Sequence, residues 1–167
     1  MKKTVRYLAF ALCAVMLLCA AACGEETPSQ GDSWRTDVTA QQVADAVLGK
    51  TAAAALLSEQ DQTVIELEMD LDLALCTDFA IYMTDSTLDE FGVFCAKDEA
   101  SAATVETAVK NYIKRCNEEW TGLYNVDEYP KLEKATTLRC GRYVVYAVLT
   151  EAERTAAFDA VKQLLKG

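Results

Sequence analysis

The second half of the chain repeats one order of secondary structure, two strands followed by a helix, and this order narrows the fold to one class. Apolar runs predict strands at residues 79–83 and 91–97, and Asp98 is placed to cap a long amphipathic helix after them. A hairpin over residues 136–140 and 142–149 and a last helix follow. Because hairpin-linked strands pair antiparallel and amphipathic helices cover apolar surface, we expect an α+β fold, with an antiparallel sheet of about four strands and helices packed on one face.

The two halves of this pattern also align in sequence. Residues 93–114 lie over residues 145–166 at an offset of 52, and the triplet Ala-Val-Lys then occurs at the same place in both. The alignment indicates a strand-strand-helix pseudo-repeat, and the alternative is chance similarity between two Ala-rich amphipathic helices. Either origin leads to the same antiparallel arrangement.

Capping boxes and apolar stripes place the helices. Thr39 with Gln42, and Thr150 with Glu153, have the spacing of capping boxes. Residues 127–134 predict a short helical turn. The apolar face of the long helix comprises Val105, Ala108, Val109, Tyr112, Ile113 and Cys116, with Trp120 one turn further on.

Residues 64–75 fit a strand only in part. Aliphatic residues at every second position alternate with Glu66, Glu68, Asp70 and Asp72. Strict alternation predicts a strand with one acidic face, although acidic residues form strands poorly. Carboxylates on one strand face stand about 6.6 Å apart, too far for all four to share one ion. The acidic face therefore predicts a solvated surface rather than a calcium site.

The first 23 residues have the pattern of a bacterial lipoprotein signal peptide. A basic head with Lys2, Lys3 and Arg6 precedes an apolar run over residues 7–22, which is shorter than a spanning helix and ends in small residues. Cys23 follows directly, so we expect it to be the lipid-attachment residue and the first residue after cleavage. The alternative is an ordinary secretory signal that leaves this cysteine free.

This interpretation divides the chain into a signal peptide at 1–22, a flexible tether at 23–37 and a single α+β domain at 38–167. The lipid would hold the domain at the cell membrane on the extracytoplasmic side. All 26 acidic residues follow the signal peptide, as do 13 of the 16 basic ones, so the mature chain carries a net charge of −13. Nucleic acid would repel such a domain, and we expect a surface or envelope protein as its partner instead.

The composition excludes several kinds of catalytic site. The chain contains no histidine, so Ser-His-Asp and Cys-His nucleophile systems and His-ligated metal sites are excluded. Its seven glycines form no phosphate-binding motif. We therefore predict no catalytic residues, no cofactor and no metal site. Hydrolysis by a pair of Asp or Glu carboxylates stays compatible with the composition, because both residue types are abundant.

Two sets of residues allow more than one interpretation. Four cysteines allow either two disulfides, with three connectivities, or free buried thiols. They are Cys76, Cys95, Cys116 and Cys140. Four aromatic residues offer either an exposed recognition patch or part of the core. They are Trp34, Trp120, Tyr124 and Tyr129.

From about Asp37 onward the chain carries the motifs of a known family. The motifs are Asp89-Glu90-Phe91-Gly92-Val93-Phe94 with Lys97-Asp98, then Lys114-Arg115, Tyr124, residues 129–135 and Gly141-Arg142-Tyr143-Val144. In these residues the chain resembles a family of Gram-positive lipoproteins known as domain of unknown function 4358. The resemblance implies a lipid-anchored exported protein with one small domain, and it brings no activity, ligand or catalytic residue with it.

The anchor, the tether and the missing catalytic sets favour a non-catalytic binding or interaction module at the cell surface. The alternative is an acid/base hydrolase that acts on cell-wall or glycan material through a pair of Asp or Glu residues. Two facing carboxylates in a deep pocket, with perturbed titration, would favour the hydrolase.

Overall fold

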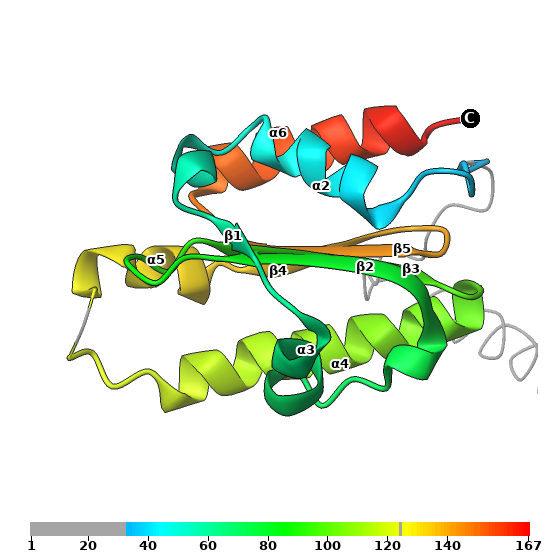
Figure 1. The fold of residues 1–167 in the computed structure, drawn as a ribbon. Helices are drawn as coiled ribbons and strands as arrows, with labels where there is room; N and C mark the ends of the chain where they lie inside the picture. Colours follow the sequence, from blue (N-terminus) through cyan, green and yellow to red (C-terminus); the bar gives the residue numbers. More distant parts are fainter. Residues whose placement is uncertain (1–32, 124) are drawn as a thin grey trace, which may run out of the picture. The chain divides into compact units, whose positions relative to one another are not determined.

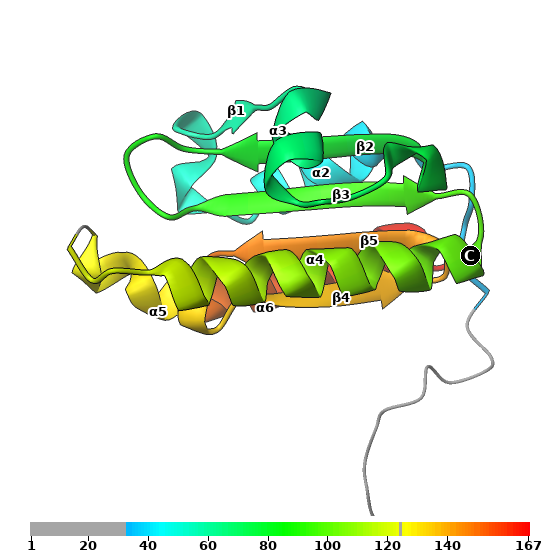
Figure 2. The same ribbon diagram turned by 90° about the horizontal axis from the view of Figure 1, so that it is seen from below.

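The computed structural model describes residues 33–123 and 125–167, which form an antiparallel sheet between two layers of helices (Figures 1 and 2). Among these residues the strand order is β1 (Ser58–Glu59), β2 (Cys76–Met83), β3 (Glu90–Ala96), β5 (Tyr143–Val148) and β4 (Thr136–Cys140). The helices are α2 (Ala40–Leu48), α3 (Gln62–Glu68), α4 (Glu99–Glu119), α5 (Tyr129–Glu133) and α6 (Glu151–Leu165). Short 3₁₀ turns are η1 (Ala52–Ala55), η2 (Leu73–Leu75) and η3 (Val126–Glu128).

The predicted α+β class with an antiparallel sheet is confirmed, but the expectation that the helices share one face is wrong. In Figure 1, α2 and α6 cover one face of the sheet, whereas α3 and α4 cover the other. The physical reason is β5, which is buried at every position and therefore needs cover on both sides. Its alternate residues join two cores, Tyr143, Val145 and Ala147 with α2 and α6, and Val144, Tyr146 and Val148 with α4.

The pseudo-repeat holds for the order of the elements but not for their symmetry. The order β2-β3-α4 recurs as β4-β5-α6, and β3 pairs with β5 at the centre, with Val93 opposite Val145. A twofold axis that exchanges two neighbouring antiparallel strands is perpendicular to the sheet. Rotation about this axis leaves every helix on the same face of the sheet as before. Because α4 and α6 lie on opposite faces, no such axis relates the two halves.

The predicted helix starts are confirmed. Both capping boxes, at Thr39 and at Thr150, are present. The Asp98 carboxylate accepts a hydrogen bond from the Ser101 backbone N–H at 2.7 Å, and this bond lowers the pKa of Asp98. Helix α4 buries most of its predicted apolar face, namely Val105, Val109, Tyr112 and Ile113, together with Ala102.

The strand predicted at residues 64–75 is wrong, because this segment contains most of α3 and then η2. Asp61 caps α3 by accepting a hydrogen bond from the Thr63 backbone N–H at 2.8 Å. Ile65 and Met69 lie four residues apart and are buried together, whereas Leu67 on the opposite side is 75% exposed. Helical spacing therefore separates the aliphatic residues that alternation had placed on one face.

The compact unit of the domain runs from Ser33 to Gly167. Residues 33–37, expected in the tether, pair with the end of α6: Trp34 forms a β-bridge with Lys166, and the Arg35 N–H donates to the Leu165 carbonyl at 2.9 Å. The predicted signal peptide, Cys23 and the rest of the tether lie outside the described residues. Within the described part of the chain, no helix combines the length and the apolar character needed to cross a membrane.

Candidate functional site

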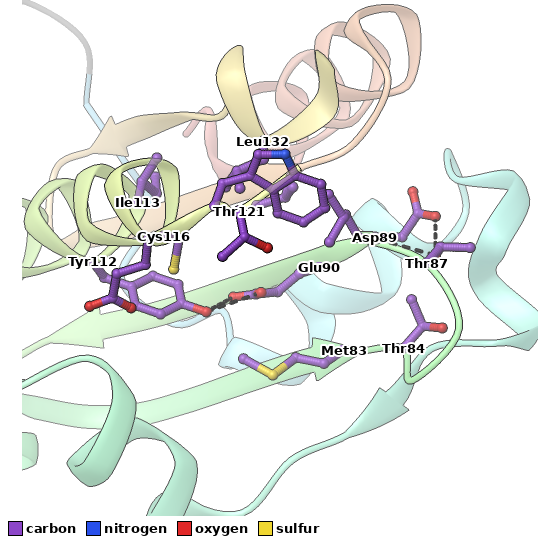
Figure 3. Close-up of a pocket in the computed structure, with 14 residues that line it drawn as sticks. Met83, Thr84, Thr87, Asp89, Glu90, Tyr112, Ile113, Cys116, Thr121 and Leu132 are labelled. Atoms are coloured by element: carbon purple, nitrogen blue, oxygen red, sulfur yellow. Dashed lines mark hydrogen bonds between the residues drawn. The ribbon is translucent and has the colours of Figure 1, made fainter. Parts of the chain in front are cut away.

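A cavity of about 390 Å³ lies on the α4 side of the sheet, where β2 ends and β3 begins (Figure 3). Its walls come from the β2–β3 connection, the second half of α4 and α5. Met83, Leu88, Ile113 and Leu132 supply apolar surface. The volume falls at the lower end of the range for small-molecule sites, so the cavity suits a small ligand or one side chain of a larger one.

Glu90, the first residue of β3, is the carboxylate at the centre of this cavity's hydrogen-bond network (Figure 3). Tyr112 of α4 donates its hydroxyl proton toward both carboxylate oxygens, at 2.9 Å to Oε1 and 3.1 Å to Oε2. Tyr146 of β5 donates to Oε1 as well. The two tyrosine rings meet edge to face with centroids 6.0 Å apart. Three elements thus hold one carboxylate in place.

Gly92 allows Tyr146 to reach Glu90. The two residues are register partners on β3 and β5, and a Cβ at Gly92 would overlap the Tyr146 ring. Without that Cβ, the ring lies directly against β3, and its hydroxyl meets the carboxylate two positions earlier in the strand. The glycine of the Asp-Glu-Phe-Gly motif is therefore explained by close packing.

Burial raises the pKa of Glu90 to about 6, and the hydrogen bonds from Tyr146 and Tyr112 oppose this rise in part. The negative charge of Glu68 adds a smaller upward contribution. Burial and the nearby carboxylate also raise the pKa of both tyrosine hydroxyls, which therefore remain protonated donors. At neutral pH Glu90 is ionised, and it takes up a proton in mildly acidic conditions.

The protons around Glu90 do not fill its acceptor capacity. An ionised carboxylate accepts up to about four hydrogen bonds. Tyr112 and Tyr146 supply one proton each, and Tyr112 shares its proton between the two oxygens. Glu90 can therefore accept further donors from a molecule in the cavity.

Asp89 lines the same cavity, but its charge is neutralised. Only 4% of its side chain is exposed, and Lys131 Nζ lies 2.9 Å from each of its carboxylate oxygens. Thr87 donates a hydroxyl hydrogen bond at 2.6 Å, and Glu128 contacts Lys131 from the other side. Burial lowers the pKa of Lys131, but its hydrogen bonds to Glu128 and Asp89 outweigh that effect and raise it. Asp89 thus belongs to a structural ion-pair network.

The aromatic residues singled out in the sequence are only partly brought together. Trp120 lines the cavity and stacks on Tyr129 with ring centroids 5.5 Å apart. Trp34 lies elsewhere, against the β4–β5 turn at Gly141. Tyr124 lies outside the described residues. Two of the four, Trp120 and Tyr129, therefore form a stacked pair, of which Trp120 lines the cavity.

Three of the cysteines in the described part of the chain do not provide an activated nucleophile. Cys76, Cys95 and Cys116 are free thiols, which excludes the alternative of two disulfides among the four domain cysteines. Burial raises the pKa of Cys76 to about 11 and that of Cys95 to about 12. Cys116 lines the cavity, and burial raises the pKa of its thiol too. These thiols stay protonated at neutral pH.

The acidic residues at 66, 68, 70 and 72 are all exposed, at the end of α3 and in the chain after it. Across the described residues, no group of three or more Cys, Asp or Glu side chains is arranged to hold a metal ion. The four acidic residues that strand alternation predicted on one face therefore lie at the end of a helix and in the chain after it.

Sequence reasoning missed the site. It placed Tyr112 on the apolar face of the long helix and Tyr146 in the second strand of a hairpin, and it named Glu90 only as part of a family motif. The available signal was local, because Asp89 and Glu90 come directly before the apolar run of residues 91–96. Two acidic residues at the start of a buried strand destabilise the fold unless hydrogen bonds or opposite charges compensate for their burial.

Comparison with protein families matches residues 52–149 to a family described as Domain of unknown function (DUF4358). The match covers more than half of the chain, so the protein belongs to this family, as its motifs predicted. Glu90, Tyr112 and Tyr146 all lie within the matched residues. Searches of curated proteins and of solved structures found no match to the chain.

Proposed function

We propose that this protein is a lipid-anchored, extracytoplasmic binding module whose ligand site is the cavity around Glu90. The observation that carries the proposal is a carboxylate held by two tyrosine hydroxyls from different elements, inside a cavity of about 390 Å³. A fixed polar group with unused acceptor capacity in a mostly apolar pocket is the usual arrangement of a small-molecule or side-chain binding site.

The surrounding chemistry favours binding over catalysis. The cavity thiol of Cys116 has a raised pKa, and the chain has no histidine to activate it. Asp89, the other buried carboxylate, has both oxygens engaged by Lys131. A general base must approach the proton that it removes, and Lys131 already lies against both oxygens of Asp89.

The alternative is an acid/base hydrolase acting on cell-wall or glycan material. The observation in its favour is Glu90, because a carboxyl with a pKa of about 6 can act as a general acid near neutral pH. It would require Asp89 or Glu119 as the second carboxylate of the cavity. Release of soluble glycan from purified cell walls by the wild-type protein, abolished in Glu90→Gln, would favour the hydrolase.

The anchor rests on the first 23 residues, with their basic head, short apolar run and small residues before Cys23. Replacing Cys23 with Ala is expected to abolish lipidation. Intact mass of the wild-type protein should give a chain that begins at Cys23 and carries a diacylglycerol. The Cys23→Ala protein should lack that mass, either released from the membrane or left as an uncleaved precursor.

Cys19→Ala is the matched control, because Cys19 follows two bulky leucines and should not be modified. It should behave as wild type in mass and in membrane fractionation. An unchanged lipid mass in Cys23→Ala would contradict the proposed anchor.

The binding role is tested by capturing partners from crosslinked cells. The wild-type protein should recover a partner above background, and filling the cavity with Thr121→Trp should reduce that recovery. Thr121 is an exposed residue of the cavity wall, so the larger side chain can be accommodated without unfolding. Thr155→Trp, exposed on α6 across the sheet, is the control. No partner above background, or equal loss in both variants, would count against a pocket-based binding module.

A further inference from the structure

The carboxylates of the cavity differ in how their charges are balanced. Three carboxylates line the cavity, Asp89, Glu90 and Glu119, and no basic residue is among the described residues that line it. Lys131 neutralises Asp89, and Glu119 is mostly exposed, at the edge of ion-pair distance from Arg115. No basic side chain of the described residues forms an ion pair with Glu90. Glu90 is therefore the uncompensated negative charge of the cavity.

An uncompensated carboxylate in a half-buried site favours a cation. Hydroxyl donors stabilise the ionised form, but they bring no opposite charge, and burying an unpaired charge is costly. A positively charged ligand that also donates hydrogen bonds would supply both the charge and the donors that Glu90 can still accept. The ligand chemistry that fits is a protonated amine.

The rest of the wall indicates what the amine is attached to. Tyr112 and Trp120 line the cavity with aromatic rings, and π faces attract cations. The ring of Tyr112 already attracts one cation, because Arg115 lies over it 5.8 Å from the ring centroid, and Trp120 stacks on Tyr129. Apolar groups complete most of the surface, including Met83 and Ile113. An ammonium group matches the carboxylate of Glu90 and the aromatic rings, and a short aliphatic chain matches the apolar lining. A ligand of this kind fits a cavity of about 390 Å³.

We infer that the cavity binds an alkylammonium group, with Glu90 as its counter-ion and Tyr112 and Trp120 as its aromatic wall. This inference rests on the proposed function and names the ligand class of that same site. A free aliphatic amine and the lysine side chain of a peptide share this chemistry. The same cavity can bind either the free amine or the lysine side chain.

Titration of Glu90 gives the binding a characteristic pH dependence. The groups whose interactions with Glu90 are resolved are Tyr112 and Cys116 from α4, Tyr146 from β5 and Glu68 from α3, and the two hydroxyls and the thiol stay neutral between pH 5 and pH 8. Asp89 and Glu119 line the same cavity. The cations nearby are engaged elsewhere, Lys131 with Asp89, and Arg115 with the ring of Tyr112 and at 4.0 Å from Glu119. As the pH falls through about 6, Glu90 takes up a proton and loses the charge that attracts the ammonium. Affinity for an amine should therefore fall about tenfold between pH 8 and pH 5.

The test is calorimetric titration of the full chain, in a non-ionic detergent, with pentylamine, pentanol and pentanoate. Pentylamine should bind at least tenfold more tightly than the neutral or the anionic probe. Glu90→Gln should weaken pentylamine binding at least tenfold and remove its pH dependence. Glu118→Gln makes the same change at an exposed position of α4 outside the cavity and should bind like wild type. Tight binding of Nα-acetyl-lysine amide or of pentylamine supports the inference, and their ratio distinguishes a peptide from a free amine.

A second variant covers the case in which Glu90→Gln does not fold. Tyr112→Phe removes a hydrogen bond that lowers the pKa of Glu90, so the midpoint of the pH profile should move upward. Amine affinity should then fall at pH 6 and change little at pH 8. Pentanol bound as tightly as pentylamine, no binding of any probe, or an unchanged pH profile would overturn the ammonium assignment. These outcomes would leave the proposed binding module in place. The binding module would be contradicted only if partner capture failed, or if Thr121→Trp did not reduce that capture.

Discussion

Replacing Val109 with Asp is expected to unfold the domain. Val109 is fully buried in the core between α4 and the sheet. The new carboxylate would lose its hydration without gaining a partner, and the methyl groups it replaces would leave unfilled space. We expect a loss of about 4 kcal/mol or more in the free energy of unfolding, against a total of about 5–15 kcal/mol for a typical domain. A thermal melt followed by circular dichroism should show a midpoint lowered by about 15 °C or no cooperative transition.

Asn111→Asp provides the matched control for this substitution. It introduces the same carboxylate two residues further along α4, at an exposed position. Its free energy of unfolding should stay within about 0.5 kcal/mol of wild type. If Val109→Asp melted like this control, α4 would not pack on the sheet through the face described here.

The long helices and the central strands were predictable because several independent signals agreed. In α4 a cap at Asp98 precedes an apolar stripe that runs through Val105 and Val109. In α6 a capping box at Thr150 precedes an equally regular stripe. A strand that is apolar on both faces, as β5 is, also has the pattern of a central strand. Where cap, period and composition coincide, local sequence is enough to place an element.

The segment at 64–75 shows where such reasoning fails. Alternating acidic and aliphatic residues satisfy the period of a strand, but Ile65 and Met69 also satisfy the spacing of a helix. Tertiary contact decided between them, because the core under α3 holds those two side chains and leaves Leu67 in water. The cap at Asp61 was the local signal that could have favoured a helix.

The site could not be derived from the sequence because its parts are distant in the chain. Tyr112 lies 22 residues from Glu90, and Tyr146 lies 56 residues from it. In the sequence, each of these tyrosines has the pattern of an ordinary core residue of its own helix or strand. Only the order of strands, with β3 beside β5 and α4 across them, brings both hydroxyls to one carboxylate.

Replacing Lys131 with Met should destabilise the domain by about 3–5 kcal/mol, because it leaves the buried Asp89 carboxylate without its cation. Asp89 would keep only the Thr87 hydroxyl among its side-chain hydrogen bonds in the described structure. Lys134→Met is the control three residues later, since the pair of Lys134 with Glu151 is exposed and worth at most about 1 kcal/mol. Urea unfolding of the two variants beside wild type measures the difference.

A double variant separates the charge from the loss of side-chain packing. Asp89→Asn combined with Lys131→Met removes both charges, so it should recover a large part of the stability lost in Lys131→Met alone. A simple packing defect would instead persist in the double variant. If Lys131→Met unfolded at the same urea concentration as Lys134→Met, Asp89 would not depend on Lys131 for its charge balance. The distinction between a neutralised Asp89 and an uncompensated Glu90, on which the ligand chemistry of the cavity rests, would then be wrong.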